Sequence, residues 1–184
     1  MKFSIIIANY NYERFVGQAI DSALAVRWPD IEVIVVDDGS TDQSRQVIAT
    51  YGDRITSILQ DNTGQLGACN AGFSKATGDW IIFLDSDDLL DPSIAEEVAR
   101  VSTPRTSKVQ FQMERIDSEG QPTGSHFPVY DPFPTPEKVK DWAVRLAAYP
   151  SPPGSGNAFT RVFLDRIFPL DKACGDAPDS EMVT

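Results

Sequence analysis

The chain has 184 residues, enough for one domain with a sizeable core, and 41% of them are hydrophobic. Its 27 acidic and 16 basic residues give a formal net charge of −11, which argues against a nucleic-acid partner bound through a broad basic face. No apolar run approaches the roughly 20 residues of a membrane span, so we expect a soluble, cytoplasmic protein, with peripheral contact at the inner face of a membrane left open.

Signals for strands and helices alternate through the first hundred residues. Short apolar runs predict the strands. The first helix is predicted from apolar residues at helical spacing, the third from a run of small residues, and the second and fourth from signals at their N-termini. The expected order is strand 3–8, helix 14–24, strand 31–36, helix 41–51, strand 55–59, helix 65–76, strand 80–84 and a helix that ends at 101. Ser40 with Gln43 is typical of a capping box for the second helix, and Gly78 of a C-terminal stop for the third. This alternation predicts an α/β fold with a mostly parallel sheet and helices on both faces.

After Pro104 the pattern is less regular. The expected elements are a strand over 108–116, a hairpin-like turn over 117–120, a loop over 121–136, a helix over 135–148, a loop over 150–157 and a helix over 159–167. His126, the one histidine of the sequence, falls in the first loop and is interpreted as a structural or surface residue. The last residues, 179–184, resemble the first turn of a helix. We therefore expect the chain to be a truncated piece of a longer protein.

Polar clusters follow three of the predicted strands, and one of them is strongly acidic. They are Asn9–Tyr12, Asp37–Asp38 and Asp85–Asp88. Because parallel strands end at one edge of a sheet, these clusters can converge on one site. Adjacent carboxylates repel one another unless a cation or a proton holds them, and Mg²⁺ or Mn²⁺ takes oxygen ligands while leaving positions for phosphate oxygens. A solvated turn is the ordinary alternative for the last cluster, and a helix-capping loop for Asp37–Asp38.

Further residues favour a nucleotide as the ligand. Tyr10 could stack on a nucleobase while a nearby carboxylate accepts a base N–H group, although alone it is an ordinary surface tyrosine. Gly64 and Gly67 open the third helix and would let backbone N–H groups approach a phosphate or a sugar. The sequence has no G-x-G-x-x-G after its first strand and no G-x-x-x-x-G-K-[ST], which disfavours a dinucleotide fold and a P-loop site.

Taken together, these residues resemble the family 2 inverting glycosyltransferases, which have the GT-A fold. The matching stretches are Ser4–Asn11, Val35–Asp42, Asn62–Gly64 through Asn70–Gly72, and Gly78–Asp79 through Asp85–Asp88. Residues 101–184 match more loosely, through Ser155-Gly156-Asn157, Phe159, Arg161 and Asp179. The resemblance implies one GT-A domain, in which residues 1–100 form the nucleotide-sugar donor-binding half and residues 101–184 an incomplete acceptor-side half.

The resemblance also implies an activity and a role for each residue. A sugar would move from a nucleotide-diphosphate donor, most simply a UDP-sugar, to a hydroxyl of a saccharide or lipid-linked acceptor with inversion, as in polysaccharide biosynthesis of the cell envelope. The nucleotide-binding residues would be Ala8, Tyr10, Asp38, Gly64, Gln65 and Asp85. Asp87 and Asp88 would hold Mg²⁺ or Mn²⁺ at the leaving diphosphate. Asp179 would be the general base, with Asp176 as the fallback.

Two departures and three alternatives accompany this interpretation. Many relatives have an arginine near Cys69, and a paired acid where this chain has Pro178-Asp179.

One alternative is a glycosyltransferase fragment that binds nucleotide without activity. A receiver-type signalling domain would need a lone phospho-accepting aspartate after the third strand and a lysine after the fifth, which the sequence supplies poorly. A sugar nucleotidylyltransferase would need a basic, glycine-rich loop where this chain has Asn9–Asn11.

Overall fold

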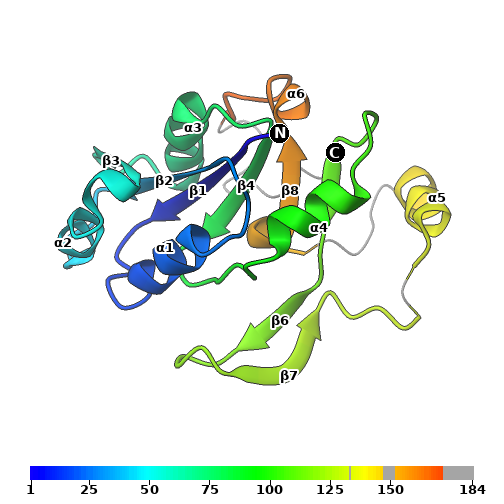
Figure 1. Cartoon of the computed structure of the whole chain (residues 1–184), viewed down its shortest axis with the longest axis horizontal. Coiled ribbons are helices and arrows are strands. Elements are labelled where there is room, and N and C mark those ends of the chain that lie inside the picture. The colour runs from blue at the N-terminus through cyan, green and yellow to red at the C-terminus, as the bar shows by residue number, and fades with distance from the viewer. Residues whose placement is uncertain (133, 147–151, 172–184) are drawn as a thin grey trace.

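A mixed six-stranded sheet forms the centre of the protein (Figure 1). The structure, a computed structural model, describes residues 1–132, 134–146 and 152–171. The strand order is β3-β2-β1-β4-β8-β5. The bounds are β1 Phe3–Asn9, β2 Ile31–Asp38, β3 Thr56–Gln60, β4 Trp80–Asp85, β5 Lys108–Gln110 and β8 Asn157–Thr160. Strands β1 to β4 are mutually parallel, whereas β8 runs antiparallel to both of its neighbours.

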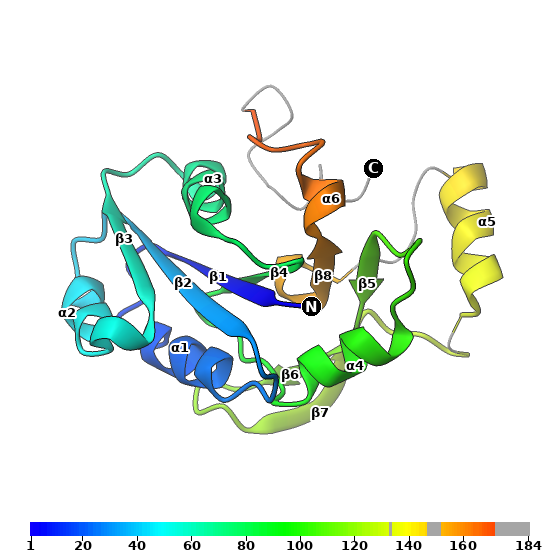
Figure 2. The same ribbon diagram turned by 45° about the horizontal axis from the view of Figure 1, so that its top comes forward.

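Helices cover both faces of this sheet, as the sequence predicts (Figure 2). On one face lie α1 (Val16–Leu24), α2 (Ser44–Ala49) and α4 (Ile94–Val101), and on the other lie α3 (Gln65–Lys75) and α6 (Arg161–Leu164). Successive side chains of a strand point to opposite faces of the sheet. Ile5 and Ile7 therefore pack in the core on the α1 side, and Ile6 packs in the core on the α3 side. The continuous apolar runs of β1, β2 and β4 thus supply two cores.

The chain reverses its direction of winding beside β1, which creates a crevice. Helices α1 and α2 connect β1 to β2 and β2 to β3 on one face, and α3 then returns on the opposite face to place β4 on the other side of β1. Ligands of open parallel sheets bind at such a switch point, beyond the carboxyl ends of the strands. Ala8 pairs with Asp85, and Asn9 pairs with Asp37, so the three predicted polar clusters do meet at this edge.

Helix α3 packs closely on β1 at Gly72. A Cβ atom at Gly72 would be only 2.4 Å from Cγ2 of Ile6 and 3.3 Å from Cγ2 of Val36. A glycine at this position therefore sets the distance between the helix and the strands that carry the crevice.

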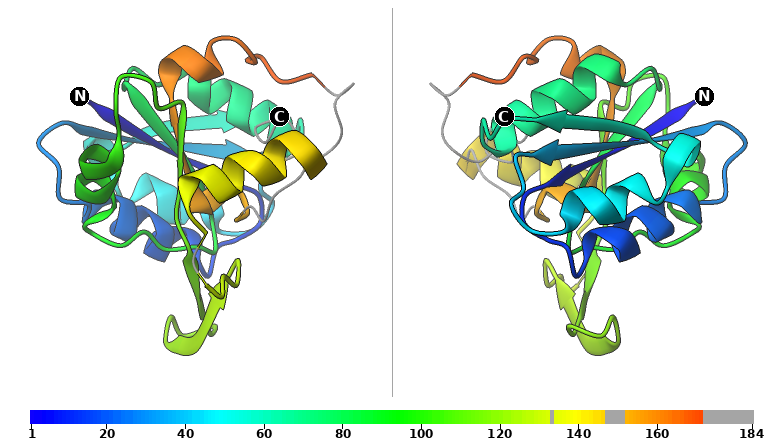
Figure 3. Two further views of the ribbon diagram at one scale, coloured as in Figure 1. Left: turned by 90° about the vertical axis from the view of Figure 1, so that its right-hand side faces the viewer. Right: turned by 90° about the vertical axis from the view of Figure 1, so that its left-hand side faces the viewer.

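A separate antiparallel hairpin projects from the body of the molecule (Figure 3, yellow-green). It consists of β6 (Met113–Ile116) and β7 (Pro122–Phe127), and helix α5 (Pro136–Leu146) follows it. Asp117 accepts hydrogen bonds from the backbone N–H groups of Glu119 and Gln121, which confirms the predicted turn. Within the described residues, no helix has the length and apolar character needed to cross a bilayer.

Two predicted helix signals are wrong. Helix α2 begins at Ser44, and Ser40 does not cap it, because the Ser40 hydroxyl accepts hydrogen bonds from the Asn9 side chain and the Asn11 backbone. Gly78 does not end α3 by a left-handed turn. Instead it permits a close approach of chains, since a Cβ atom there would lie 2.6 Å from the Ser4 backbone nitrogen.

The second half of the chain differs more from the prediction. The expected strand over 108–116 is two strands, β5 and β6, which belong to different sheets. Residues 122–127, expected in a loop, form β7, and Phe159, expected in a helix, lies in β8 between β4 and β5. Part of the loop expected over 150–157 is a short 3-10 helix, η2 (Gly154–Gly156), and another, η1 (Gly52–Arg54), follows α2. Strands β5 and β8 are formed by pairing with segments distant in the sequence, whereas β6 and β7 pair with each other as a hairpin.

Candidate functional site

A cavity of about 600 Å³ lies at the carboxyl ends of β1, β2 and β4. Its lining combines aromatic, amide and carboxylate side chains with the first turn of α3: Ala8, Asn9, Tyr10, Tyr12, Asp38, Asn62, Gly64, Gln65, Ala68, Asp85, Ser86 and Asp87. Every residue predicted to bind the nucleotide is in this set, together with Asp87. Asp88 lines a neighbouring cavity that also includes Asp87. We call the first of these the donor cavity.

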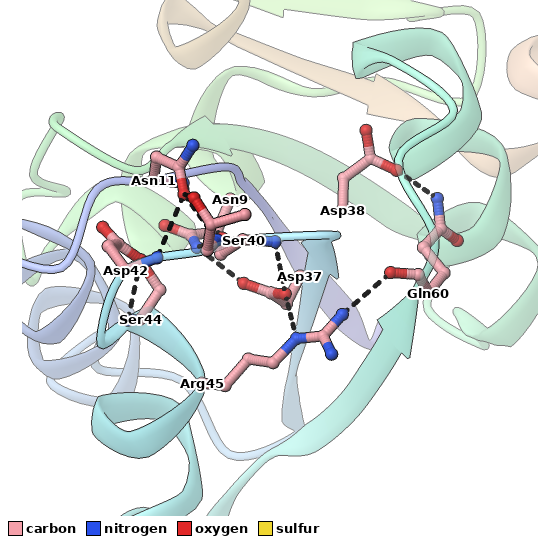
Figure 4. A network of polar contacts seen from close by, with 10 residues as sticks. Asn9, Asn11, Asp37, Asp38, Ser40, Asp42, Ser44, Arg45 and Gln60 are labelled. Carbon is pink, nitrogen blue, oxygen red and sulfur yellow. Dashed lines mark hydrogen bonds and ion pairs between the residues drawn. The ribbon is translucent and has the colours of Figure 1, made fainter.

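The two aspartates at the end of β2 face opposite sides of the strand (Figure 4). This follows from the two-residue period of a strand. Asp38 points towards the donor cavity, and Asp37 points away from it, towards α2. Both side chains are buried, at 3% and 0% exposure, so each carboxylate needs partners.

Asp38 holds the loop that precedes α3. Its Oδ1 accepts hydrogen bonds from Gln60 Nε2 at 2.7 Å and from the Thr63 backbone and hydroxyl at 2.9 and 3.1 Å. Its Oδ2 accepts one from the Gly64 backbone N–H at 2.8 Å. A carboxylate oxygen can accept about two such bonds in good geometry, so among these partners Oδ2 is the less occupied atom.

Asp37 is the centre of a structural network. It accepts hydrogen bonds from Arg45 Nε at 2.7 Å, Asn9 Nδ2 at 3.0 Å and the Ser40 backbone at 3.1 Å. Arg45 also donates to the Gln60 carbonyl at 2.9 Å, which connects α2 to β3. Burial alone would raise the pKa of Asp37, but the hydrogen bonds from Arg45, Ser40 and Asn9 outweigh it and hold the pKa below the ordinary value. Asp37 is therefore ionised and fixes the ends of β1 and β2.

The loop after β1 presents two tyrosines to the cavity. Asn11 has a positive φ of 61°, a conformation that asparagine tolerates better than most residues. Its Oδ1 accepts from the backbones of Thr41 at 2.7 Å and Asp42 at 3.3 Å, which ties this loop to the one after β2. Tyr10 and Tyr12 on either side of it are 46% and 42% exposed. Their rings are accessible for stacking on a planar ligand.

The acidic cluster at the end of β4 is held by two serines. The Asp85 backbone N–H donates to Ser155 Oγ at 2.9 Å, and Ser86 Oγ donates to the Ala8 carbonyl at 2.7 Å. The Asp85 carboxylate lies 3.4 Å from Gln65 Nε2 across the cavity. Burial raises the pKa of the Asp88 carboxyl, a hydrogen bond from Ser155 opposes this rise, and the nearby charge of Asp87 adds to it.

The carboxylates of the cavity suit a cation whose coordination shell is completed by a bound ligand. Over residues 1–132, 134–146 and 152–171, no group of three or more His, Cys, Asp or Glu side chains is arranged to hold a metal ion. Mg²⁺ sites commonly use only one or two carboxylates together with substrate phosphates. Asp85 and Asp87 face the same cavity, so they can serve in such a site.

Other predicted residues lie elsewhere. Asp176 and Asp179 fall outside the described residues. Phe159 is buried in the core, and Arg161 donates to the Gly78 carbonyl at the opposite edge of the sheet, so neither reaches the cavity. His126 is exposed on β7. Cys69 is buried on α3, in the core between this helix and the sheet.

Ser155 is the residue whose role the sequence did not reveal. It lies 70 residues from Asp85 and is 3% exposed. Asn157 holds its loop by donating from Nδ2 to the Pro153 carbonyl at 2.8 Å. The resemblance places Ser155 in a stretch of the acceptor-side half, and the local sequence, rich in proline, glycine and serine, indicates a loop, but nothing in either predicts a contact with the end of β4.

The sequence is similar to those of known glycosyltransferases. The family profile described as Glycosyl transferase family 2 matches residues 4–168. An uncharacterized glycosyltransferase of Nostoc sp. is 40% identical over 182 residues, which is 93% of this chain and 54% of that protein. The poly(ribitol-phosphate) beta-N-acetylglucosaminyltransferase TarS of Staphylococcus aureus is 32% identical over 129 residues, or 66% of this chain and 22% of that protein. The chain thus spans about half the length, or less, of these curated relatives.

Solved structures share the fold. The 1–349 fragment of TarS covers 100% of this chain and 54% of its own with a TM-score of 0.73 at 22% identity. The same fragment in complex with UDP-GlcNAc gives a TM-score of 0.50 at 32% identity, over 54% of this chain and 30% of that one. The mannosyltransferase PcManGT of Pyrobaculum calidifontis, in complex with GDP-Man and Mn²⁺, gives 0.68 at 21% identity, over 97% and 50%. These similarities confirm the predicted GT-A fold.

Proposed function

The chain belongs to glycosyl transferase family 2, and we propose that it binds a nucleotide-diphosphate sugar in the donor cavity and transfers the sugar to an acceptor hydroxyl with inversion. One observation carries this proposal. The register of β1, β2 and β4 brings Tyr10, Asp38, Asp85 and Asp87 to the wall of one cavity at the switch point of the sheet. Because the chain spans only part of its relatives, the activity proposed is that of the whole protein.

The base of the nucleotide would lie at the Tyr10 and Asp38 end of the cavity. Tyr10 offers an exposed ring for stacking, and Asp38 Oδ2 is the carboxylate oxygen with the greater remaining capacity to accept a base N–H group. We propose uracil as the base, since the similar TarS fragment was solved with UDP-GlcNAc. Guanine is the other candidate, because PcManGT was solved with GDP-Man. Ala8, Gly64 and Gln65 would contact the remainder of the nucleotide from the walls of the cavity.

The diphosphate would lie near the acidic cluster, with Mg²⁺ or Mn²⁺. Asp85 would contribute to the ribose and the metal, and Asp87, with Asp88 beside it, would hold the metal. The presence of Mn²⁺ in the PcManGT complex supports this choice of cofactor. When bound, such an ion offsets the negative charge of the leaving diphosphate. It would also reduce the repulsion between a polyphosphate and a chain of net charge −11.

The acceptor half and the general base stay proposals from the sequence. Residues 1–100 would form the donor half and residues 101–184 part of the acceptor half of one domain. Asp179, with Asp176 as the fallback, would take the proton from the acceptor hydroxyl as it attacks the anomeric carbon. A single displacement of this kind inverts the anomeric configuration.

The direct test is to incubate the protein with UDP- and GDP-sugars, Mn²⁺ and a mixture of saccharide acceptors, and to follow release of the nucleoside diphosphate. Proton NMR of the product then gives its anomeric configuration. We expect release that depends on Mn²⁺ and is lost in Asp87→Asn, with retention of activity in the control Asp53→Asn, which changes an exposed carboxylate on η1. A product with the donor's configuration would contradict inversion. Tight nucleotide binding without release would favour a binding protein that has lost activity.

A further inference from the structure

A second cavity of about 510 Å³ adjoins the donor cavity, and the two share Asp87. Its walls come from the acidic cluster, from Phe15 before α1, and from the β6–β7 hairpin, which contributes Met113, Glu114 and Phe127. We call it the hairpin groove. We propose that the hairpin groove binds the acceptor and that this acceptor is an uncharged saccharide. The assignment to an acceptor rests on the proposed function, whereas the chemistry of the ligand is argued from the groove itself.

The groove offers apolar surface to the faces of sugar rings. Phe127, at the end of β7, is a large apolar side chain that is 39% exposed. The other residues of this strand are also exposed and are mostly polar. The guanidinium of Arg115 lies 6.0 Å from the centre of its ring and covers one side of it. Phe15 and Met113, both half-buried, also line the groove. Such a cleft, with aromatic walls and a few polar groups, suits a ligand with both C–H faces and hydroxyl groups.

The charge of the groove selects against an anionic ligand. Its acidic side chains are Asp87, Asp88, Glu114 and Asp117, against Arg115 in the lining and Arg14, whose guanidinium lies 5.5 Å from the centre of the Phe15 ring. Even with the first two engaged at the diphosphate, Glu114 and Asp117 remain exposed on the hairpin. Over a distance of about 8 Å, the screening length at physiological salt, they repel phosphates but can accept hydrogen bonds from sugar hydroxyls. TarS, by its name, acts on a poly(ribitol-phosphate), so the two proteins would differ in the charge of their acceptors.

The position of the groove fits an acceptor. Asp87, at the junction of the two cavities, is at the acidic end of the donor cavity. A saccharide in the hairpin groove would therefore lie beside the acidic cluster, where the diphosphate of the donor is proposed to lie.

Saturation-transfer NMR on the whole chain tests this inference, with and without UDP and Mn²⁺. The probes are neutral trisaccharides of glucose, galactose, mannose and N-acetylglucosamine, and, as the anionic counterpart, a glycerol phosphate trimer. We expect at least one neutral trisaccharide to bind and the glycerol phosphate trimer to bind at least about tenfold more weakly. Phe127→Ala should weaken the neutral ligand about three- to tenfold, Phe127→Tyr should retain it, and Val129→Ala, 78% exposed and outside the groove, should leave it unchanged.

Three outcomes would overturn the inference: equal binding of the anionic trimer, no binding of any neutral trisaccharide, or unchanged binding in Phe127→Ala. A parallel titration with UDP and Mn²⁺ separates it from the proposed function. If UDP binds and the saccharides do not, the groove inference fails and the donor site stands. If a saccharide binds through Phe127 and no nucleotide binds, the groove stands and the proposed donor site fails.

Discussion

Adjacent residues can have unrelated tasks when they end a buried strand, and Asp37 and Asp38 are an example. Asp37 is fully buried and ion-paired with Arg45, so its charge stabilises the ends of the strands. Asp38, on the other face, binds the loop before α3 and lines the donor cavity. The sequence shows only two successive carboxylates. Their division follows from the period of the strand and from which face α2 covers.

Asp38→Asn tests the role of the second carboxylate. The amide replaces an acceptor with a donor that faces other donors, the backbone N–H groups of Thr63 and Gly64. A hydrogen bond to a charged group is worth about 1.5–3 kcal/mol, so we expect the affinity for UDP to fall at least about tenfold. Equilibrium titration measures it. Asp61→Asn, an exposed change on the same loop, is the control, and equal affinities for the two variants would contradict the assignment.

Asp179→Asn tests the proposed general base in the whole protein. The amide cannot accept the proton of the acceptor hydroxyl, so transfer should fall by about 10² or more while UDP affinity stays unchanged. Steady-state transfer rates and a binding titration of the same variant separate the two effects. Unimpaired transfer would move the base elsewhere, with Asp176→Asn as the next variant.

At the scale of elements, the strands and helices of residues 1–101 were predictable, whereas from residue 108 on the sequence predicted the turn after β6 and helix α5 but not β7 or β8. Strands β1, β2 and β4 are continuous apolar runs, α1 has apolar residues at helical spacing and α3 is a run of small residues, so local sequence predicts them. The polar clusters at their ends follow from the parallel order. The signals that failed did so for two different reasons. Ser40 resembles a helix cap, but its hydroxyl is used by the loop after β1. Strand β7 is exposed along its whole length, so no alternation marks it.

Contacts with distant segments explain β8 and the role of Ser155. Phe159 is buried by pairing with Ile81 and Lys108, at separations of 78 and 51 residues, and an apolar run of this length does not distinguish a strand from a helix. Ser155 gains its role because β8 places its loop beside the end of β4. Both positions depend on the sheet as a whole.

Gly72→Ala tests the close packing of α3 on β1. The added methyl group would meet Cγ2 of buried Ile6 at 2.4 Å, so the helix or the strand must shift. We expect a loss of about 1–3 kcal/mol in the free energy of unfolding, measured by denaturant titration. Gly17→Ala in α1 is the matched control. Its Cβ atom would meet neighbours at an ordinary 3.4 Å, so it should be neutral or stabilising by up to about 1 kcal/mol. Equal stabilities of the two variants would contradict this packing.

At the scale of the whole molecule, the two edges of the sheet differ in how their acidic side chains are paired. The carboxyl edge carries the open acidic cavity. The amino edge is closed by Glu32, which pairs with Lys2 Nζ at 2.8 Å and accepts hydrogen bonds from Ser4 and Thr77. Burial by itself would raise the pKa of Glu32, but the hydrogen bonds from Lys2, Ser4 and Thr77 lower it to about 2, against an ordinary value of 4.5. The ionised Glu32 therefore stabilises the fold at the amino edge, and this fold positions the acidic cavity at the carboxyl edge.

The shift makes stability depend on pH. Because the folded pKa is lowered, the stabilisation from Glu32 is complete above about pH 4.5 and is lost as the pH falls towards 2. At neutral pH, Glu32→Gln should reduce the free energy of unfolding by about 1–3 kcal/mol, and the difference from the wild type should shrink below pH 4.5. Denaturant titrations at a series of pH values measure it. Glu96→Gln, which breaks an exposed pair with Arg27, should cost under about 1 kcal/mol, and a pH-independent cost at Glu32 would contradict the linkage.

The central claim is a metal-dependent nucleotide site at the carboxyl ends of β1, β2 and β4. Calorimetric titration of UDP into the protein, first with Mn²⁺ and then with EDTA, tests it most directly, with Asp87→Asn beside the wild type. We predict that the wild type binds UDP in Mn²⁺ and that its affinity falls at least about tenfold in EDTA. The affinity of Asp87→Asn in Mn²⁺ should be lower by a similar factor. Equal affinity in Mn²⁺ and EDTA would contradict the metal assignment, and no binding of UDP or GDP in either condition would contradict the donor site itself.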